Sequence, residues 1–188
     1  MTPLAGPAFV VVGVLGAAGV AKVWRPSPTA TALREIRVPK PLLAARLMGL
    51  GEVVVGMVAL ATGHPLAWGL VAAAYTGFAL FVLWALRSDG AVGSCGCFGH
   101  EDTPPTPGHA AFNAAAAAIA ALVVSDPVGV RDLDGSATER VLAVTLVAAA
   151  VYASILALTS LPRLLAIASG NAPVAVPSFA LRPESDRT

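Results

Sequence analysis

Two cysteines one residue apart are the residues of this chain whose type and spacing could do chemistry. Cys95 and Cys97 flank Gly96, and the sequence contains no other cysteine. A disulfide stabilises a fold mainly by closing a long loop of the unfolded chain, and a bridge between near neighbours closes almost none. The pair is therefore predicted to be a redox couple rather than a structural staple. Two alternatives stay open: a soft-metal clamp, and thiols that take no part in function.

The residues around the two thiols favour disulfide exchange over metal binding. A disulfide between the cysteines would close a small, strained ring, and Gly96 would let the backbone turn tightly enough to form it. Strain makes a disulfide more oxidising and more easily exchanged. Phe98 and Gly99 follow and would let the loop lie against a membrane. His100 could complete a Cys-x-Cys-x2-His set for Zn or Cu(I). A solvated loop histidine is the favoured interpretation, so no metal site is predicted.

The chain that must position these thiols has the composition of a membrane protein. Of its 188 residues, 56% are hydrophobic and 12% are charged, and the mean hydropathy is +0.76. Soluble domains have about 25% charged residues. Residues 2–21, 65–86 and 141–161 contain no charged side chain, and about 20 apolar residues cross a bilayer. We therefore expect a multi-pass protein of the plasma membrane in contact with the lipid bilayer. A net charge of +1 gives no sign of a nucleic-acid partner.

The predicted fold class is all-α, a polytopic membrane bundle of four to five transmembrane helices. The bundle would occupy residues 1–162, with the redox loop at 87–107, and residues 163–188 would form a mobile tail. A short amphipathic helix at 29–38 is expected to lie on the membrane surface, after a helix break at Pro26-Ser27-Pro28. Trp24, Trp68 and Trp84 are predicted to anchor helix ends at the membrane interface. The expected transmembrane helices span about residues 7–21, 42–61, 66–86, 108–124 and 140–161.

The distribution of lysine and arginine predicts the topology. Residues 22–40 carry five of these basic side chains, and the cysteine loop and the tail add further arginines. Basic loops stay in the cytoplasm, so the N-terminus is expected outside and these three segments inside. Cytosolic thiols are kept reduced, which fits an oxidising function poorly. A dithiol recessed into the bilayer would escape that difficulty.

Polar side chains inside the apolar segments are further candidates. A charge at the centre of a membrane helix costs at least about 2.5 kcal/mol, so Glu52 should have an ion-pair partner or a functional role. Arg46 would point away from it, and Lys22 is the predicted partner. A structural ion pair is slightly favoured over a proton relay. His109 and Asn113 lie four residues apart and should share a helix face. His109 could assist thiolate formation or lie at the interface; Asn113 could orient a polar group or hydrogen-bond a neighbouring helix.

The Cys-Gly-Cys-Phe-Gly run after the third helix resembles that of the MauE family of methylamine-utilisation membrane proteins, which is related to DoxX-like proteins. Other residues also resemble the pattern of this family: Lys22 with Trp24-Arg25-Pro26, Glu52, and His109 with Asn113. Together the similarities cover about residues 7–122. The resemblance implies a helical-bundle thiol–disulfide oxidoreductase that supports disulfide maturation of a client protein. The family precedent is the small subunit of methylamine dehydrogenase, in methylamine metabolism. The fifth helix and the tail extend beyond the four-helix core of that family.

Membrane disulfide generators commonly use two cysteine pairs, and this chain has one. We therefore expect direct exchange with a partner, for which a thioredoxin-fold protein is the natural candidate. A quinone is a candidate electron acceptor, although no quinone site is evident in the sequence. Two other classes of function stay open. One is a non-catalytic membrane scaffold in a redox complex, and the other is a metal-handling protein that uses Cys95, Cys97 and His100.

Overall fold

The computed structural model describes residues 3–88, 105–133 and 135–168. Within these ranges the chain is helical and contains no strand, which confirms the predicted all-α class. Five of the helices are long and apolar enough to cross a bilayer, as expected for a polytopic membrane bundle. The elements are α1 (Ala5–Trp24), α2 (Ser27–Glu35), α3 (Pro41–Thr62), α4 (Pro65–Arg87), α5 (Pro107–Ser125), the 3-10 helix η1 (Val130–Asp132) and α6 (Ala137–Ala168).

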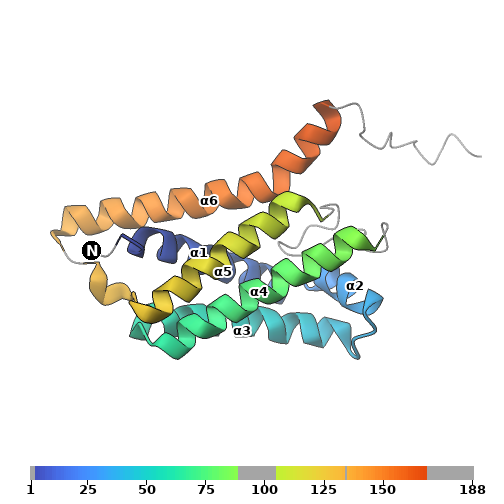
Figure 1. The fold of residues 1–188 in the computed structure, drawn as a ribbon, viewed down its shortest axis with the longest axis horizontal. Helices are drawn as coiled ribbons and strands as arrows, with labels where there is room; N and C mark the ends of the chain where they lie inside the picture. The colour runs from blue at the N-terminus through green and yellow to red at the C-terminus, as the bar shows by residue number, and fades with distance from the viewer. Residues whose placement is uncertain (1–2, 89–104, 134, 169–188) are drawn as a thin grey trace, which may run out of the picture.

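The five long helices run alongside one another in alternating directions (Figure 1). The C-terminal ends of α1, α4 and α6, the N-terminal end of α5, and α2 therefore share one end of the bundle. This agrees with the prediction that the basic segment 22–40 and the flanks of the cysteine loop lie on one side of the membrane. The cysteine loop itself and residues 169–188 lie outside the described residues.

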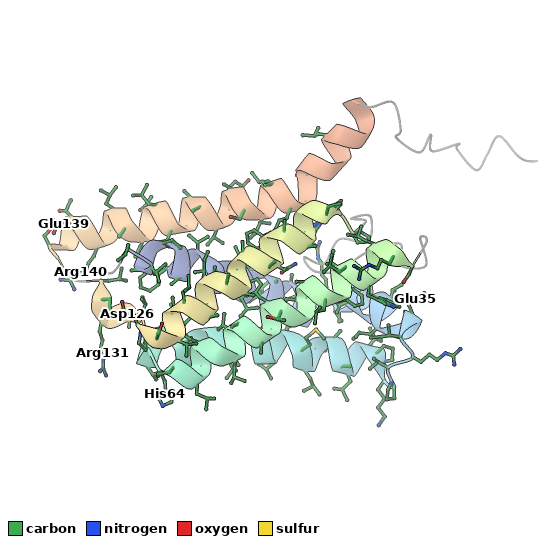
Figure 2. The ribbon with its side chains drawn as sticks, in the orientation of Figure 1. Glu35, His64, Asp126, Arg131, Glu139 and Arg140 are labelled. Carbon is green, nitrogen blue, oxygen red and sulfur yellow. The ribbon has the colours of Figure 1, made fainter. Side chains whose placement is uncertain are left out.

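The labelled polar side chains lie at the two ends of the bundle (Figure 2). Figure 2 shows Glu35 at the end that carries α2. The opposite end carries most of the labelled polar groups, where α3 turns into α4 and α5 connects to α6. This distribution is the one that a bilayer around the middle of the helices requires, since a charge within hydrocarbon is costly. The labelled residues at the second end are His64, Asp126, Arg131, Glu139 and Arg140.

Helix α1 supplies much of the protein core. Its buried side chains pack with those of α4 and α5, and the core includes Val11, Leu15, Val71 and Ala120. Alanine is frequent on α5, and small side chains let neighbouring membrane helices approach closely. Ala116 and Ala120 of α5 are buried in this core.

The interface role predicted for the tryptophans is wrong for Trp68. Its side chain is fully buried, at 0% exposure, and its Nε1 donates a hydrogen bond of 2.8 Å to the carbonyl oxygen of Val128. The chain after α5 folds back over the start of α4, so the indole N–H finds a backbone partner inside the protein. Trp24, in contrast, is 81% exposed at the end of α1, as an interface anchor would be.

Helix α2 begins two residues earlier than predicted. The Pro26-Ser27-Pro28 run was predicted to precede the helix, but Ser27 and Pro28 lie in its first turn. The backbone N–H groups of a first turn have no partner within the helix, so proline is tolerated there. Ala30 and Leu33 pack against Ala45 of α3. The helix ends at Glu35, three residues before the predicted end, and Arg37 takes a positive φ of 59°.

Helix α6 is the most peripheral of the spanning helices, with 6% of its apolar window buried. It lies against α1, where a Cβ on Gly13 would be 2.5 Å from Cγ2 of Val151. The helix bends near its C-terminal end (Figure 1). Pro162 lies in this part of α6 and has no backbone N–H, so the carbonyl group of Leu158 loses its usual helical donor.

Candidate functional site

An ion pair buried between α1 and α3 confirms the partner predicted for Glu52. Nζ of Lys22 donates a hydrogen bond of 2.8 Å to Oε2 of Glu52, and the two side chains are 3% and 4% exposed. Thirty residues separate them in the sequence. A lone charge here would be strongly unfavourable, so the pair couples the placement of α1 to that of α3.

Two glycines one turn before the charged residues allow this close approach. A Cβ on Gly19 would lie 2.6 Å from the carbonyl oxygen of Gly49, and a Cβ on Gly49 would lie 2.5 Å from that of Gly19. Real Cβ atoms essentially never come so close to another atom. Each glycine precedes its charged residue by three positions, so Lys22 and Glu52 project from the same contact.

Only one of the two carboxylate oxygens of Glu52 has a partner among the residues that the structure describes. Oε2 is paired with Lys22, whereas Oε1 is buried and makes no hydrogen bond to any of these residues. The ammonium group of Lys22 also lies 5.0 Å from the ring centroid of Phe78, a cation–π contact. A buried, unpaired acceptor is unusual in a folded protein and calls for an explanation.

His109 is the second buried polar group of the core. Its side chain is 2% exposed, so the interfacial alternative is wrong. Nδ1 lies 2.7 Å from Oγ1 of Thr106, the N-cap residue of α5. Among the described residues, Nε2 of this buried ring has no hydrogen-bond partner.

Asn113 shares a helix face with His109, as predicted. Its Nδ2 donates a hydrogen bond of 2.8 Å to the carbonyl oxygen of His109, within α5. The Nδ2 group of Asn113 thus bonds within its own helix, and not to a neighbouring helix as one of the two interpretations had it. Both residues line a small cavity of about 20 Å³, together with Lys22 and Tyr75. Its volume is close to that of one water molecule.

Lys22 stands between this small cavity and a much larger one. The larger cavity, of about 480 Å³, lies among α1, α2, α3 and α4, and both Lys22 and Glu52 line it. Lys22 and Phe78 border both cavities. The predicted polar residues of the first, second and fourth spanning helices therefore surround one region of the core, near the end of the bundle where α1 ends.

The predicted thiol site lies outside the described residues. Cys95, Gly96, Cys97, Phe98 and Gly99 all fall within residues 89–104, and so does His100. The described chain stops at Ser88, directly after α4, and resumes at Pro105, directly before α5. Both flanks lie at the end of the bundle that also holds α2 (Figure 1). His109 follows the second flank by four residues.

Sequence reasoning missed three residues of this region. Thr106 caps α5, and the Thr-Pro pair before an apolar run is a recognisable signal for a helix start. Tyr75 donates a hydrogen bond of 2.7 Å to the carbonyl oxygen of Val11, and Phe78 contacts Lys22. Nothing in the apolar pattern of α4 distinguishes these two aromatic residues from ordinary core.

Comparison with known proteins identifies one family. No curated protein and no solved structure matches the chain. The family model described as methylamine utilisation protein MauE matches residues 2–126, about two thirds of the chain, and this range includes Lys22, Glu52, both cysteines, His109 and Asn113. It ends before α6, in agreement with the expectation that the last helix extends beyond the family core. On this match, the chain is a multi-pass membrane protein that belongs to the MauE family.

Proposed function

We propose that the protein is a membrane thiol–disulfide oxidoreductase that uses Cys95 and Cys97 to support disulfide formation in a client protein. The observation that carries the proposal is the position of the two cysteines. They are the only cysteines of the chain, and they lie in the segment that joins α4 to α5 within the family match. A plasma-membrane location and a thioredoxin-fold partner belong to the same proposal, as does a client such as the small subunit of methylamine dehydrogenase.

The reaction transfers two electrons from the client to the Cys95–Cys97 disulfide. A client thiolate attacks one sulfur of the bond and forms a mixed disulfide, and the other cysteine leaves as a thiolate. The second client thiolate then attacks the mixed disulfide and releases the client in its oxidised form. Cys95 and Cys97 are left as two reduced thiols, so the electrons lost by the client equal those gained by the pair.

The supporting residues have separate parts in this proposal. Gly96 permits the tight turn of an oxidised pair, and Phe98 and Gly99 hold the loop against the membrane surface. Lys22 and Glu52 fix α1 to α3 as a positioning pair. His109, with Asn113 bonded to its carbonyl oxygen, is the titratable group of α5 nearest in sequence to the second flank of the thiol segment, and it would favour the thiolate form of a neighbouring cysteine.

Trapping of mixed disulfides tests the proposal. Membranes that contain the full chain with Cys95→Ser or with Cys97→Ser should yield a covalent adduct with a co-expressed thioredoxin-fold protein, and reductant should release it. The double variant Cys95→Ser/Cys97→Ser is the control and should yield none. A scaffold subunit would form no adduct with either single variant. A metal-handling protein would instead hold stoichiometric Zn or Cu that is lost in Cys97→Ser.

A further inference from the structure

The cavity of about 480 Å³ is lined mainly by apolar side chains, with a few polar side chains among them. Side chains of α1, α2, α3 and α4 line it, and its apolar lining includes Leu15, Leu33, Val55, Phe78 and Phe81. Lys22 and Glu52 form an ion pair in its wall, where both are almost completely buried. A cavity of this size is in the range of small-molecule sites, which combine apolar walls with a few placed polar groups.

The ion pair in the cavity wall has unused hydrogen-bonding capacity of both kinds. Oε1 of Glu52 is a buried acceptor that has no hydrogen-bond partner within the described part of the chain. Among the described residues, the ammonium group of Lys22 donates one hydrogen bond, to Oε2 of Glu52, and an ammonium group carries three N–H donors. One acceptor and further donors therefore lie side by side where the apolar walls meet the ion pair.

The cavity lining includes exposed side chains of both α3 and α4. Met48 and Leu70, on its lining, are exposed side chains within the spanning segments, where a bilayer would surround them. Gly51 and Gly77 face it from the two helices, and a Cβ on either would meet nothing within 4 Å. An occupant could therefore enter from the lipid phase without passing through water.

We propose that this cavity binds a lipid-soluble molecule with an apolar body and a single hydroxyl group that lies against the ion pair. The hydroxyl group would donate a hydrogen bond to Oε1 of Glu52 and accept one from Nζ of Lys22. A hydrocarbon would leave Oε1 unpaired, a carboxylate would face the charge of Glu52, and an amine cation would face that of Lys22. Phenols and aliphatic alcohols share the required chemistry. Neither cysteine takes part, so the inference stands apart from the proposed thiol exchange.

Native mass spectrometry of the full chain in detergent tests binding with three probes of similar apolar length. 4-Nonylphenol and 1-dodecanol carry a hydroxyl group, and nonylbenzene carries none. We expect one molecule of at least one hydroxyl probe per chain, bound at least tenfold more tightly than nonylbenzene. Preference between the two hydroxyl probes tells whether the natural occupant is phenolic or aliphatic. Equal binding of all three probes, or no binding, would overturn the proposal.

Two leucine substitutions in α4 locate the binding. Gly77→Leu fills the cavity, and we expect it to weaken binding at least tenfold. Gly69→Leu is the matched control, because a Cβ there also meets nothing within 4 Å and Gly69 does not line the cavity. Equal loss, or no loss, in the two variants would contradict the assignment. Glu52→Gln should weaken the hydroxyl probes and leave nonylbenzene unchanged, whereas Cys95→Ser/Cys97→Ser should bind as the native chain does.

Discussion

Gly19 on α1 and Gly49 on α3 approach so closely that a Cβ on Gly49 would lie 2.5 Å from the carbonyl oxygen of Gly19. Lys22 lies one turn after Gly19 on α1, and Glu52 lies one turn after Gly49 on the antiparallel α3, so the two charged residues flank this contact and form their buried ion pair across it. The backbone contact and the ion pair therefore act together: the glycines set the distance between the helices, and the charges select the register.

The first prediction concerns this glycine contact. Gly49→Ala should lower the free energy of unfolding by about 1 to 3 kcal/mol, because the backbone of α1 must move to admit the methyl group. Gly51→Ala, two residues along α3, is the control. A Cβ there meets open space, so that variant should be unchanged or stabilised by up to about 1 kcal/mol. Thermal unfolding of both variants in one detergent decides the matter, and equal midpoints would refute the contact.

A second prediction separates a structural ion pair from a proton relay. Glu52→Gln leaves a buried ammonium group without its counter-charge, which costs about 3 to 5 kcal/mol when a buried pair loses one partner. The double variant Lys22→Met/Glu52→Leu removes both charges and should recover most of that loss. The redox titration of the cysteines should stay the same in all three proteins. Loss of turnover at unchanged stability would instead favour the proton relay.

A third prediction concerns the cap of α5. Thr106→Val removes the hydroxyl group that accepts from the backbone N–H of His109 and lies 2.7 Å from its Nδ1. Loss of an N-cap costs about 1 kcal/mol. Thr76→Val is a suitable control, since the exposed Thr76 hydroxyl group donates to the Ala72 carbonyl oxygen of its own helix, and its removal should change stability by less than about 0.5 kcal/mol. Similar unfolding midpoints for the two variants would argue against a capping role.

A fourth prediction concerns membrane topology. Thr31 on α2 and Thr138 at the start of α6 are both exposed and lie at opposite ends of the bundle. In a background without native cysteines, Thr138→Cys should react with a membrane-impermeant maleimide added outside intact cells. Thr31→Cys should react only after the cells are opened, because the basic segment is expected in the cytoplasm. The reverse pattern would place the redox pair on the oxidising side of the membrane.

Hydropathy and the cost of buried charge explain what the sequence could predict. Predominantly apolar runs long enough for a bilayer located the five spanning helices. The cost of an unpaired carboxylate required a cation for Glu52, and Arg46 faced the wrong way, which left Lys22. The contact between Gly19 and Gly49 was not predicted, because glycine is common in membrane helices and its partner depends on how the two helices cross.

Other features depend on tertiary contacts that no local pattern encodes. The burial of Trp68 depends on the chain after α5 folding back to offer the Val128 carbonyl group. The large cavity depends on how α1, α2, α3 and α4 pack around it. Thr106 is different, because its Thr-Pro signal was present in the sequence and could have been used. The thiol pair stays a prediction, since Cys95 and Cys97 lie outside the described residues.

The redox titration of Cys95 and Cys97 tests the central claim most directly. The full chain is equilibrated at a series of thiol–disulfide potentials, alkylated, and analysed by mass spectrometry with and without prior reduction. The two thiols should titrate together as one disulfide with a potential above about −300 mV, the level below which structural disulfides typically lie. Gly96→Val should disfavour the oxidised form, because a branched side chain hinders the tight turn. Full alkylation of both thiols at every potential would show that Cys95 and Cys97 are not a redox couple.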